Sequence, residues 1–528
     1  MRTIPDYEPL PVAVRAYAEP PRKRRSNKGT PKQNDLGPSE WALIFDTETT
    51  TDSAQQLRLG TYQVRRAGEL SEAGLFYDPQ SLDPTELETL EAHASNRGLV
   101  MRTLEGFVDE VFFVYAYELR GTCVGLNLPF DLSRIAIGHG LARERMRGGF
   151  SLQLSRDERR PRVRVKHLNS RTSLIDFTAP RRQSTPRGMR NRGQRVPPRR
   201  GHFVDVRTLA GALLGGSWSL GRLAEHLEVE HRKMETEEHG KRFTEDYLEY
   251  AVRDAQATWE CFEQLQKQYE GYGLTETPME KIYSEASLGK AYLRQMGIEP
   301  WQDLQPDFPP ELLGAIMSSY YGGRSEVRIR REPVQILYCD FLSMYPTVCT
   351  LMGLCHFVIS EGVRWSDATE EVRRFLEEVT LEDLQKPETW PKLRALVRVK
   401  PDSDVFPVRG RYGEEGQYTI GLNHLTSEEP LWYTLADCVA SKLLTGKAPD
   451  VAEALRFKPV GVQSELAPID LAGNLDYRID PTSDDFYKRL IDLRAEVKAE
   501  QKAARRAGED EKAARLGAGQ MALKLCAN

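Results

Sequence analysis

The sequence of 528 residues lacks several features that mark special classes of protein. No apolar run approaches the roughly 18 residues of a transmembrane helix, and the N-terminus lacks the apolar centre of a signal peptide. The seven cysteines are scattered without a Cys-x-x-Cys pair, which argues against a structural zinc site or a disulfide framework. We therefore expect a reduced cytoplasmic protein, nucleoid-associated if bacterial, with no membrane partner.

The sequence also lacks a large excess of either charge. Lys and Arg together number 73 and Asp and Glu 78, so the net charge is −5. This balance excludes a uniformly basic binder of polyanions, so a nucleic-acid surface must come from local clusters of Arg and Lys. Hydrophobic residues make up 40%, which is enough for ordinary buried cores, and no internal repeat is present.

Two stretches rich in Arg and Pro stand out. Residues 1–38 have little apolar periodicity and are predicted to form a disordered basic tail. Residues 180–200 hold about eight arginines and no acid, between two strand-like runs, RVRVKHL and HFVDVRTL. Each stretch is either a solvated segment or a contact for the DNA backbone, and the sequence leaves both interpretations open.

Acidic residues recur in three patterns in the first half of the chain. In the strand-like run IFDTET, Asp46 and Glu48 share one face, about 7 Å apart, where they repel each other unless a cation binds between them. Asp131 lies near the predicted start of a helix, and Tyr250 and Asp254 share a face of another. Alone, each pattern also fits a surface turn, a stabilised helix N-terminus or a common helical pair.

Together, the three patterns resemble the exonuclease motifs of the DEDD superfamily in its tyrosine-bearing form. FDTET matches DxE, NLPFD matches Nx(2–3)FD, and YAVRD matches YxxxD. The resemblance implies an RNase H-like domain that removes nucleotides from a DNA 3′ end with two Mg²⁺ or Mn²⁺ ions. It implies that Tyr250 orients the attacking water, that Asn127 contacts DNA, and that the metals are bound by Asp46, Glu48, Asp131 and Asp254. Asp176 and Asp205 match no ligand position and are interpreted as structural.

A second group of motifs follows at residues 320–346. PVQILYCD is predicted to be an apolar strand ending at Asp340. DFLSMYP resembles DxxSLYP, motif A of the family B DNA polymerases, and Tyr320, Gly322 and Gly323 match their YxGG element. The resemblance implies that Asp340 binds catalytic Mg²⁺, that Tyr345 selects deoxynucleotides, and that the YxGG element contacts DNA.

The C-terminal segment is predicted to be one long helix from about Asp484. Arg494 and Lys498 are four residues apart, a spacing that suits a nucleoside triphosphate. Lys524 and Asn528 match the first part of motif B, KxxxNSxYG. The resemblance implies that these four residues bind the incoming nucleotide.

The resemblance covers about residues 41–528 and implies an α/β (α+β) chain. We expect a tail at 1–38, the exonuclease domain at 39–275, a partial palm with an insertion at 276–480, and fingers helices at 481–528. The motifs stop before motif C and the thumb, so we expect the N-terminal portion of a DNA polymerase. Its exonuclease site would be complete, and a C-terminal half would complete the polymerase site. The alternatives are a standalone 3′–5′ exonuclease with a DNA-holding module and a catalytically dead DNA-binding protein.

Overall fold

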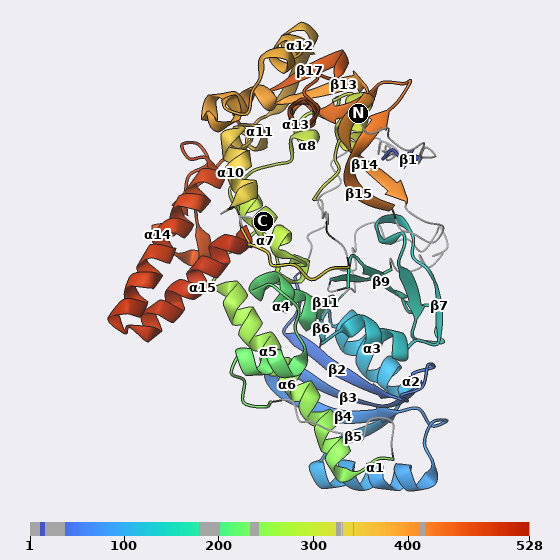
Figure 1. Cartoon of the computed structure of the whole chain (residues 1–528). Helices are drawn as coiled ribbons and strands as arrows, with labels where there is room; N and C mark the ends of the chain where they lie inside the picture. Colours follow the sequence, from blue (N-terminus) through green and yellow to red (C-terminus); the bar gives the residue numbers. More distant parts are fainter. Residues whose placement is uncertain are drawn as a thin grey trace, which may run out of the picture.

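The structure is a computed structural model of mixed α/β architecture (Figure 1). It describes residues 11–15, 37–170, 172–178, 201–232, 242–323, 329, 331–339, 341, 343–411 and 418–526. The predicted basic loop 180–200 and most of the predicted tail lie outside these ranges. No helix within them is long and apolar enough to cross a membrane.

A six-stranded sheet organises the N-terminal half, in the order β11-β6-β2-β3-β4-β5. β2 pairs antiparallel with β3 and parallel with β6, which also pairs parallel with β11. The strands are β2 (Trp41–Thr49), β3 (Leu57–Arg66), β4 (Glu69–Tyr77), β5 (Val100–Thr103), β6 (Thr122–Gly125) and β11 (His202–Asp205). The strand predicted to begin at Trp41 is therefore confirmed as β2.

β2 is buried on both faces, and its period-2 alternation divides its side chains between two cores. Leu43 and Phe45 pack with the helix η1 (Phe107–Glu118) and α3 (Leu128–Arg134). Ile44 points the other way and packs with α4 (Val206–Leu214), α5 (Leu220–His226) and α6 (Glu245–Glu270). The same alternation continues after Phe45 and determines the face to which Asp46 and Glu48 point.

The helix α6 confirms the helical pattern predicted after Leu220. The Thr244 side chain caps it by accepting a hydrogen bond from the Tyr247 backbone N–H. Glu245 and Asp246 in its first turn interact favourably with the positive end of the helix dipole. α6 packs on β2 and β3, while α1 (Pro84–Arg97) covers its N-terminal half. Figure 1 shows α6 crossing the sheet diagonally.

A smaller antiparallel sheet, β10-β9-β8-β7, lies beside α3. Its strands are β7 (Gly138–Leu141), β8 (Phe150–Gln153), β9 (Val163–His167) and β10 (Ser173–Phe177). β9 and β11 correspond to the strand-like runs predicted on either side of the basic loop.

A separate module occupies the top of Figure 1. A four-stranded sheet runs in the order β12-β17-β13-β16 and carries α12 (Thr369–Glu378) and α13 (Leu435–Thr445). Its strands are β12 (Gly362–Asp367), β13 (Ala395–Lys400), β16 (Leu431–Thr434) and β17 (Asp450–Val460). This module fills most of the predicted insertion, in which the sequence contains no assignable motif.

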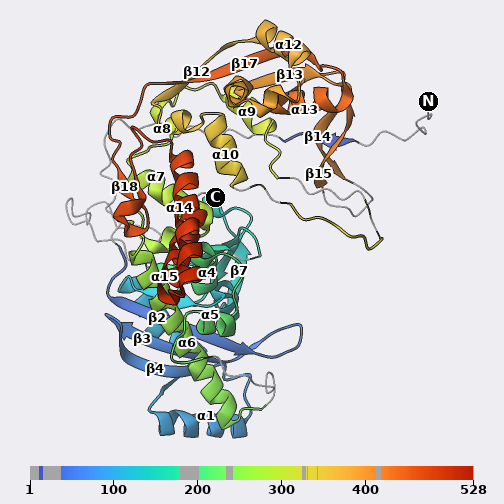
Figure 2. The ribbon, with the colours of Figure 1, turned by 60° about the vertical axis from the view of Figure 1, so that its left-hand side comes forward.

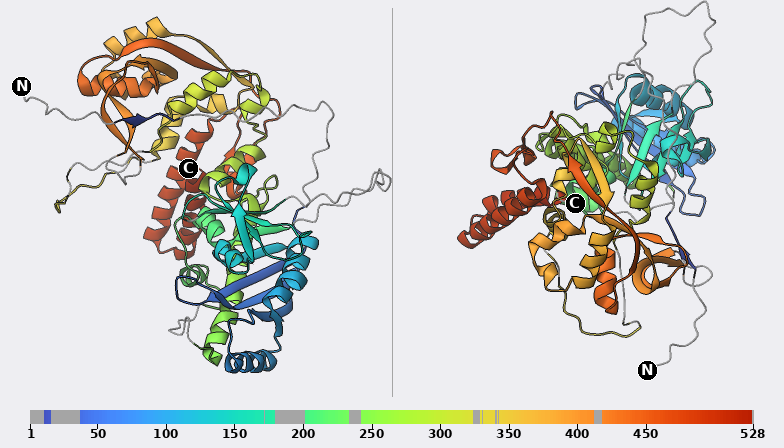
Figure 3. Two further views of the ribbon diagram at one scale, coloured as in Figure 1. Left: turned by 90° about the vertical axis from the view of Figure 1, so that its right-hand side faces the viewer. Right: turned by 90° about the horizontal axis from the view of Figure 1, so that it is seen from above.

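A long hairpin of β14 (Asp402–Arg411) and β15 (Tyr418–Thr426) projects from this module. β1 (Val12–Ala13) pairs antiparallel with the outer edge of β14, as the left panel of Figure 3 shows. This part of the tail was predicted to be disordered and is instead a strand, because the open edge of β14 supplies backbone partners.

The prediction of a single long C-terminal helix is wrong, because the structure has two helices there. α14 (Phe486–Ala507) ends at Gly508, whose φ of 72° is left-handed, and α15 (Asp510–Cys526) follows. Glycine adopts this conformation without the steric cost that other residues incur, so the chain turns there. The two helices pack side by side as a helical hairpin (Figure 2), and α15 also contacts α7 (Glu285–Gln295) and α4.

The prediction of an apolar strand that ends at Asp340 is also wrong. The described residues of 333–341 form no strand, and Ile336, Leu337 and Tyr338 are 77%, 89% and 84% exposed. Among the described strands none pairs with this segment, and a strand needs a neighbour to satisfy its backbone N–H and C=O groups. The apolar pattern is present, but the pairing partner that would make it a strand is not part of this sheet system.

Candidate functional site

The alternation of β2 separates the side chains of Asp46, Thr47 and Glu48. Asp46 and Glu48 continue the face of Ile44, which packs toward α6, and Thr47 continues the opposite face. The Tyr247 hydroxyl of α6 donates a hydrogen bond of 2.7 Å to Glu48 Oε2, which confirms this direction. The two acids of the DxE pattern therefore face the helix that carries the YxxxD pattern.

Tyr250 and Asp254 lie one turn apart on the buried face of α6. The Tyr250 hydroxyl is hydrogen-bonded to Asp254. Burial, and then the negative charges of Asp254, Glu48 and Asp46, raise the pKa of Tyr250 well above its usual value. The phenol therefore stays protonated and acts as a hydrogen-bond donor.

Tyr247 is a second tyrosine in this site, and the sequence analysis missed it. Its pKa is also raised, first by burial and then by the charge of Glu48, with a smaller contribution from Asp46. Tyr247 lies three residues before Tyr250, so both rings occupy one helix face. The three-residue spacing is present in the sequence, but Tyr247 lies outside the YxxxD pattern, which identifies Tyr250 alone.

Asp131 reaches β2 from the opposite side, at the start of α3. Its Oδ1 accepts hydrogen bonds from the Thr47 backbone N–H (3.2 Å) and the Thr47 hydroxyl (2.6 Å). The side chain is only 2% exposed, and burial raises its pKa to about 8, with repulsion from Asp205 adding to the shift. A bound cation would favour the ionised form of this carboxyl.

The four predicted metal ligands converge on β2 but do not form one compact group. In the described part of the chain, the group whose ligand atoms all lie within 4.8 Å of one another is Glu230, His231 and Glu260. His231 and Glu260 already bond each other at 2.6 Å, and this hydrogen-bonded pair lies outside the predicted site. The predicted set nonetheless fits a hard divalent ion, since it offers carboxylate oxygens of which Asp131 and Asp254 are deeply buried.

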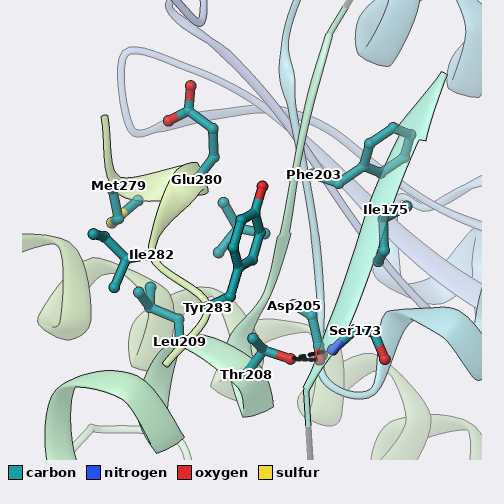
Figure 4. Close-up of a pocket in the computed structure, with 11 residues that line it drawn as sticks. Ser173, Ile175, Phe203, Asp205, Thr208, Leu209, Met279, Glu280, Ile282 and Tyr283 are labelled. Atoms are coloured by element: carbon teal, nitrogen blue, oxygen red, sulfur yellow. Dashed lines mark hydrogen bonds between the residues drawn. The ribbon is translucent and has the colours of Figure 1, made fainter. Parts of the chain in front are cut away.

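Asp205 fixes the loop that leads into α3. Its carboxylate accepts from the backbone N–H of Asn127 (2.7 Å) and Leu128 (3.3 Å) and from the Thr208 hydroxyl (2.6 Å). Figure 4 shows Asp205 beside Thr208 and Ser173. The cavity here is about 10 Å³, room for about one water molecule, so it is no substrate site. These contacts place Asn127, whose φ of 64° is left-handed, at the N-terminus of α3.

A larger cavity of about 610 Å³ lies between α3 and the small sheet. The Arg134 guanidinium stacks over the Phe130 ring at 4.9 Å. Both residues line the cavity, together with Asn127, His139, Phe150 and His167 among others. The sequence analysis missed the three that come from β7–β9, because short strands carry no motif that signals a binding surface.

The YxGG residues are held by the hairpin β14–β15. Arg409 Nη2 donates to the Tyr320 carbonyl at 2.7 Å, and its guanidinium lies 4.4 Å from the Tyr321 ring centroid. Gly322 has a φ of 81°, which favours glycine. A Cβ on Gly323 would lie 3.8 Å from the Tyr345 hydroxyl, so the YxGG element lies beside motif A.

Of the predicted nucleotide-binding residues, Arg494 reaches the motif A segment. Its Nη1 donates to Ser343 Oγ at 2.6 Å, and burial lowers its pKa. Ser343 itself has a left-handed φ of 51° and begins α10 (Met344–Leu351). Lys498 and Lys524 are exposed on α14 and α15, and Tyr345 is exposed as well. Asp340 and Asn528 lie outside the described residues.

One family model matches part of the chain, and one solved structure shows a distant similarity to it. No curated protein matches the chain. Among solved structures, phi29 DNA polymerase complexed with single-stranded DNA is 13% identical with a TM-score of 0.39, and the match covers 92% of this chain and 66% of that one. Residues 223–392 match the family of type B DNA polymerases, organellar and viral, and they contain Tyr250, Asp254 and Tyr345. The match of this segment supports the resemblance to the family B DNA polymerases that the motifs predict.

Proposed function

We propose that residues 39–275 form a 3′–5′ exonuclease that removes nucleotides from single-stranded DNA ends. The observation that carries this proposal is the convergence on β2 of Asp46 and Glu48, which face α6, with the hydrogen-bonded Tyr250–Asp254 pair of that helix. Asp131 joins the same strand through Thr47. An acidic, buried site of this kind suits metal-assisted phosphodiester hydrolysis.

The side chains divide the chemistry between them. The two Mg²⁺ or Mn²⁺ ions would be held by Asp46, Glu48, Asp131 and Asp254, and when bound they would stabilise charge on the phosphate and lower the pKa of a water. Tyr250 keeps its proton and therefore orients the attacking water through a hydrogen bond rather than removing a proton from it.

The cavity of about 610 Å³ suits a nucleobase at the 3′ end. Phe130 and Phe150 offer ring faces on which a base of any sequence could stack, and Arg134 adds a positive charge for the backbone. Asn127, at the N-terminus of α3, lines this cavity, and Asp131 lies in the first turn of the same helix. The proposed substrate is therefore an unpaired end, whose bases are free to leave the stack.

The second candidate function is deoxynucleotide transfer on a primer–template. It is favoured by the contact of Arg494 with Ser343 and by the approach of Gly323 to Tyr345. Deoxynucleoside triphosphates would bind near Arg494, Lys498, Lys524 and Asn528, with Asp340 holding Mg²⁺ and Tyr320, Gly322 and Gly323 contacting DNA. We propose that strands from a C-terminal polymerase half would cover the exposed segment around Ile336 to Tyr338.

The test of the exonuclease is the double variant Asp46→Ala and Glu48→Ala in the full chain. Loss of the metal-holding charge should lower Mg²⁺-dependent degradation of 5′-labelled single-stranded DNA by at least about 10³-fold. Glu370→Ala with Glu371→Ala removes two acids from the solvent-facing helix α12 and serves as the matched control. Undiminished degradation by the Asp46 and Glu48 variant would overturn the proposal.

A further inference from the structure

Tyr247 is almost fully buried, yet its hydroxyl is directed at one of the proposed metal ligands. The side chain is 2% exposed and donates to Glu48 Oε2 at 2.7 Å. A donor to an ionised carboxylate forms a charge-assisted bond, which is stronger and more directional than a neutral one. Because Tyr247 is not part of the YxxxD pattern, its role does not follow from the motif.

The Tyr247 ring is held on both of its faces. It stacks on Tyr250 with ring centroids 6.0 Å apart and an interplanar angle of 9°, and on Phe243 at 6.1 Å and 18°. Arg58 covers the far side of Phe243 at 4.6 Å and pairs with Glu86. The stack gives the phenol a fixed position, so the direction of its hydroxyl is determined before any substrate arrives.

The two stacked tyrosines serve different acids. Tyr250 bonds Asp254 on its own helix, whereas Tyr247 bonds Glu48 on β2, across the helix–sheet interface. One helix face therefore ties a carboxylate of the DxE pattern to one of the YxxxD pattern through a single aromatic stack. Such a connection fixes the relative orientation of groups that come from residues about 200 positions apart.

We infer that Tyr247 is a positioning residue of the proposed exonuclease site, acting by orienting the Glu48 carboxylate for a divalent cation. The inference rests on the proposed function, since it assigns Glu48 to the metal site. Hydrogen-bond partners of metal ligands fix ligand orientation, and their loss typically weakens metal affinity or activity by about 10- to 100-fold. Tyr247 acts through Glu48 and does not itself contact the reacting atoms.

The decisive variant is Tyr247→Phe in the full chain, because it removes the hydroxyl and keeps the ring in the stack. Tyr62→Phe is the matched control: Tyr62 is 1% exposed, lies on β3 of the same sheet and donates to Glu72 Oε1 at 2.6 Å. Each variant loses one buried tyrosine hydroxyl bonded to a glutamate, but only Tyr247 bonds a proposed ligand. Thermal melts of both variants establish that they remain folded.

Two measurements are made on each variant. The first is the Mg²⁺ concentration that gives half-maximal degradation of single-stranded DNA, and the second is Mn²⁺ binding, followed by the electron paramagnetic resonance signal of the free ion. Tyr247→Phe should raise both the half-maximal concentration and the Mn²⁺ dissociation constant by roughly 10-fold. Tyr62→Phe should leave both within about 2-fold, because the hydroxyl that it removes is bonded to Glu72, which is not a proposed metal ligand.

The outcomes separate the inference from the proposed function. Failure of the unaltered chain to degrade DNA would overturn the exonuclease, while the Mn²⁺ titration would still decide whether Tyr247 supports the acidic site. Degradation that Tyr247→Phe and Tyr62→Phe affect equally would overturn the positioning role alone. In a Glu48→Gln background Tyr247→Phe should add no further loss of Mn²⁺ binding, and an additive loss would show that it does not act through Glu48.

Discussion

The two groups of motif residues are built in contrasting ways. The acids around the six-stranded sheet are buried or half-buried, and two of them bond to another element, Glu48 to Tyr247 of α6 and Asp131 to Thr47 of β2. The motif A segment is irregular and exposed before α10, and Ser343 at its N-cap bonds to Arg494 of α14. A site becomes rigid when the elements that carry it pair with each other, and here only the first site meets that condition.

The contrast predicts very different sensitivities to side-chain loss. Phe45→Ala should reduce the free energy of unfolding by about 3–5 kcal/mol, because the ring is fully buried and packs edge-on to Phe112. Leu337→Ser, at a residue that is almost fully exposed, should change it by no more than about 0.5 kcal/mol. Urea titrations of the full chain measure both. Equal losses would mean that the segment around Leu337 is packed and that the comparison is wrong.

The proposed nucleobase cavity should show the next largest effect. Phe130→Ala should weaken binding of a single-stranded oligonucleotide by about 1–3 kcal/mol, roughly 5- to 150-fold, by removing a stacking surface. Leu141→Ala removes an exposed apolar side chain from β7 of the neighbouring sheet and is the control. Fluorescence anisotropy with a labelled oligonucleotide measures the change, and an effect of Leu141→Ala as large as that of Phe130→Ala would contradict the assignment of the cavity.

The link between Asp131 and β2 tests how tightly the first site is built. Thr47→Val keeps the shape of the side chain and removes the hydroxyl that donates to Asp131 at 2.6 Å. With Mg²⁺ bound, or above about pH 8, the carboxyl is ionised and the loss should cost about 1.5–3 kcal/mol. Thr61→Val loses a bond of 3.1 Å to the neutral Ala251 carbonyl and should cost about 1 kcal/mol. Thermal melts with and without Mg²⁺ compare the two, and equal costs would mean that Asp131 contributes no special charge to the site.

The sequence predicted the first site better than the second for a physical reason. Asp46, Glu48, Tyr250 and Asp254 lie in elements whose periodicity is fixed locally, so a strand face and a helix face could be read from spacing alone. The strand before Asp340 had an equally clear apolar pattern, but pairing depends on neighbours that no local pattern reveals. The break at Gly508 was missed because the Ala, Arg and Lys residues on both sides favour a helix.

Tertiary contacts account for the remaining residues that spacing did not reveal. Phe150 and His167 join Phe130 only because the small sheet folds against α3. Arg409 reaches Tyr320 from a hairpin almost 90 residues away, so no motif could signal this contact. The resemblance to a family depends on local motifs, whereas the walls of the cavities depend on how distant elements pack.

The smallest expected effect concerns the bond between Arg494 and Ser343 in the second region. Arg494→Ala removes the bond to Ser343 Oγ, but the partner hydroxyl is accessible to water, so the free energy of unfolding should fall by no more than about 1 kcal/mol. Arg489→Ala, five residues earlier on α14 and in contact with Glu496, is the control for loss of an arginine from this helix. Because the bond ties Ser343 to α14, Arg494→Ala should also speed proteolysis near Tyr338, whereas Arg489→Ala should not. A loss of several kcal/mol would show that the second region is as tightly built as the first, and the comparison between the two sites would fail.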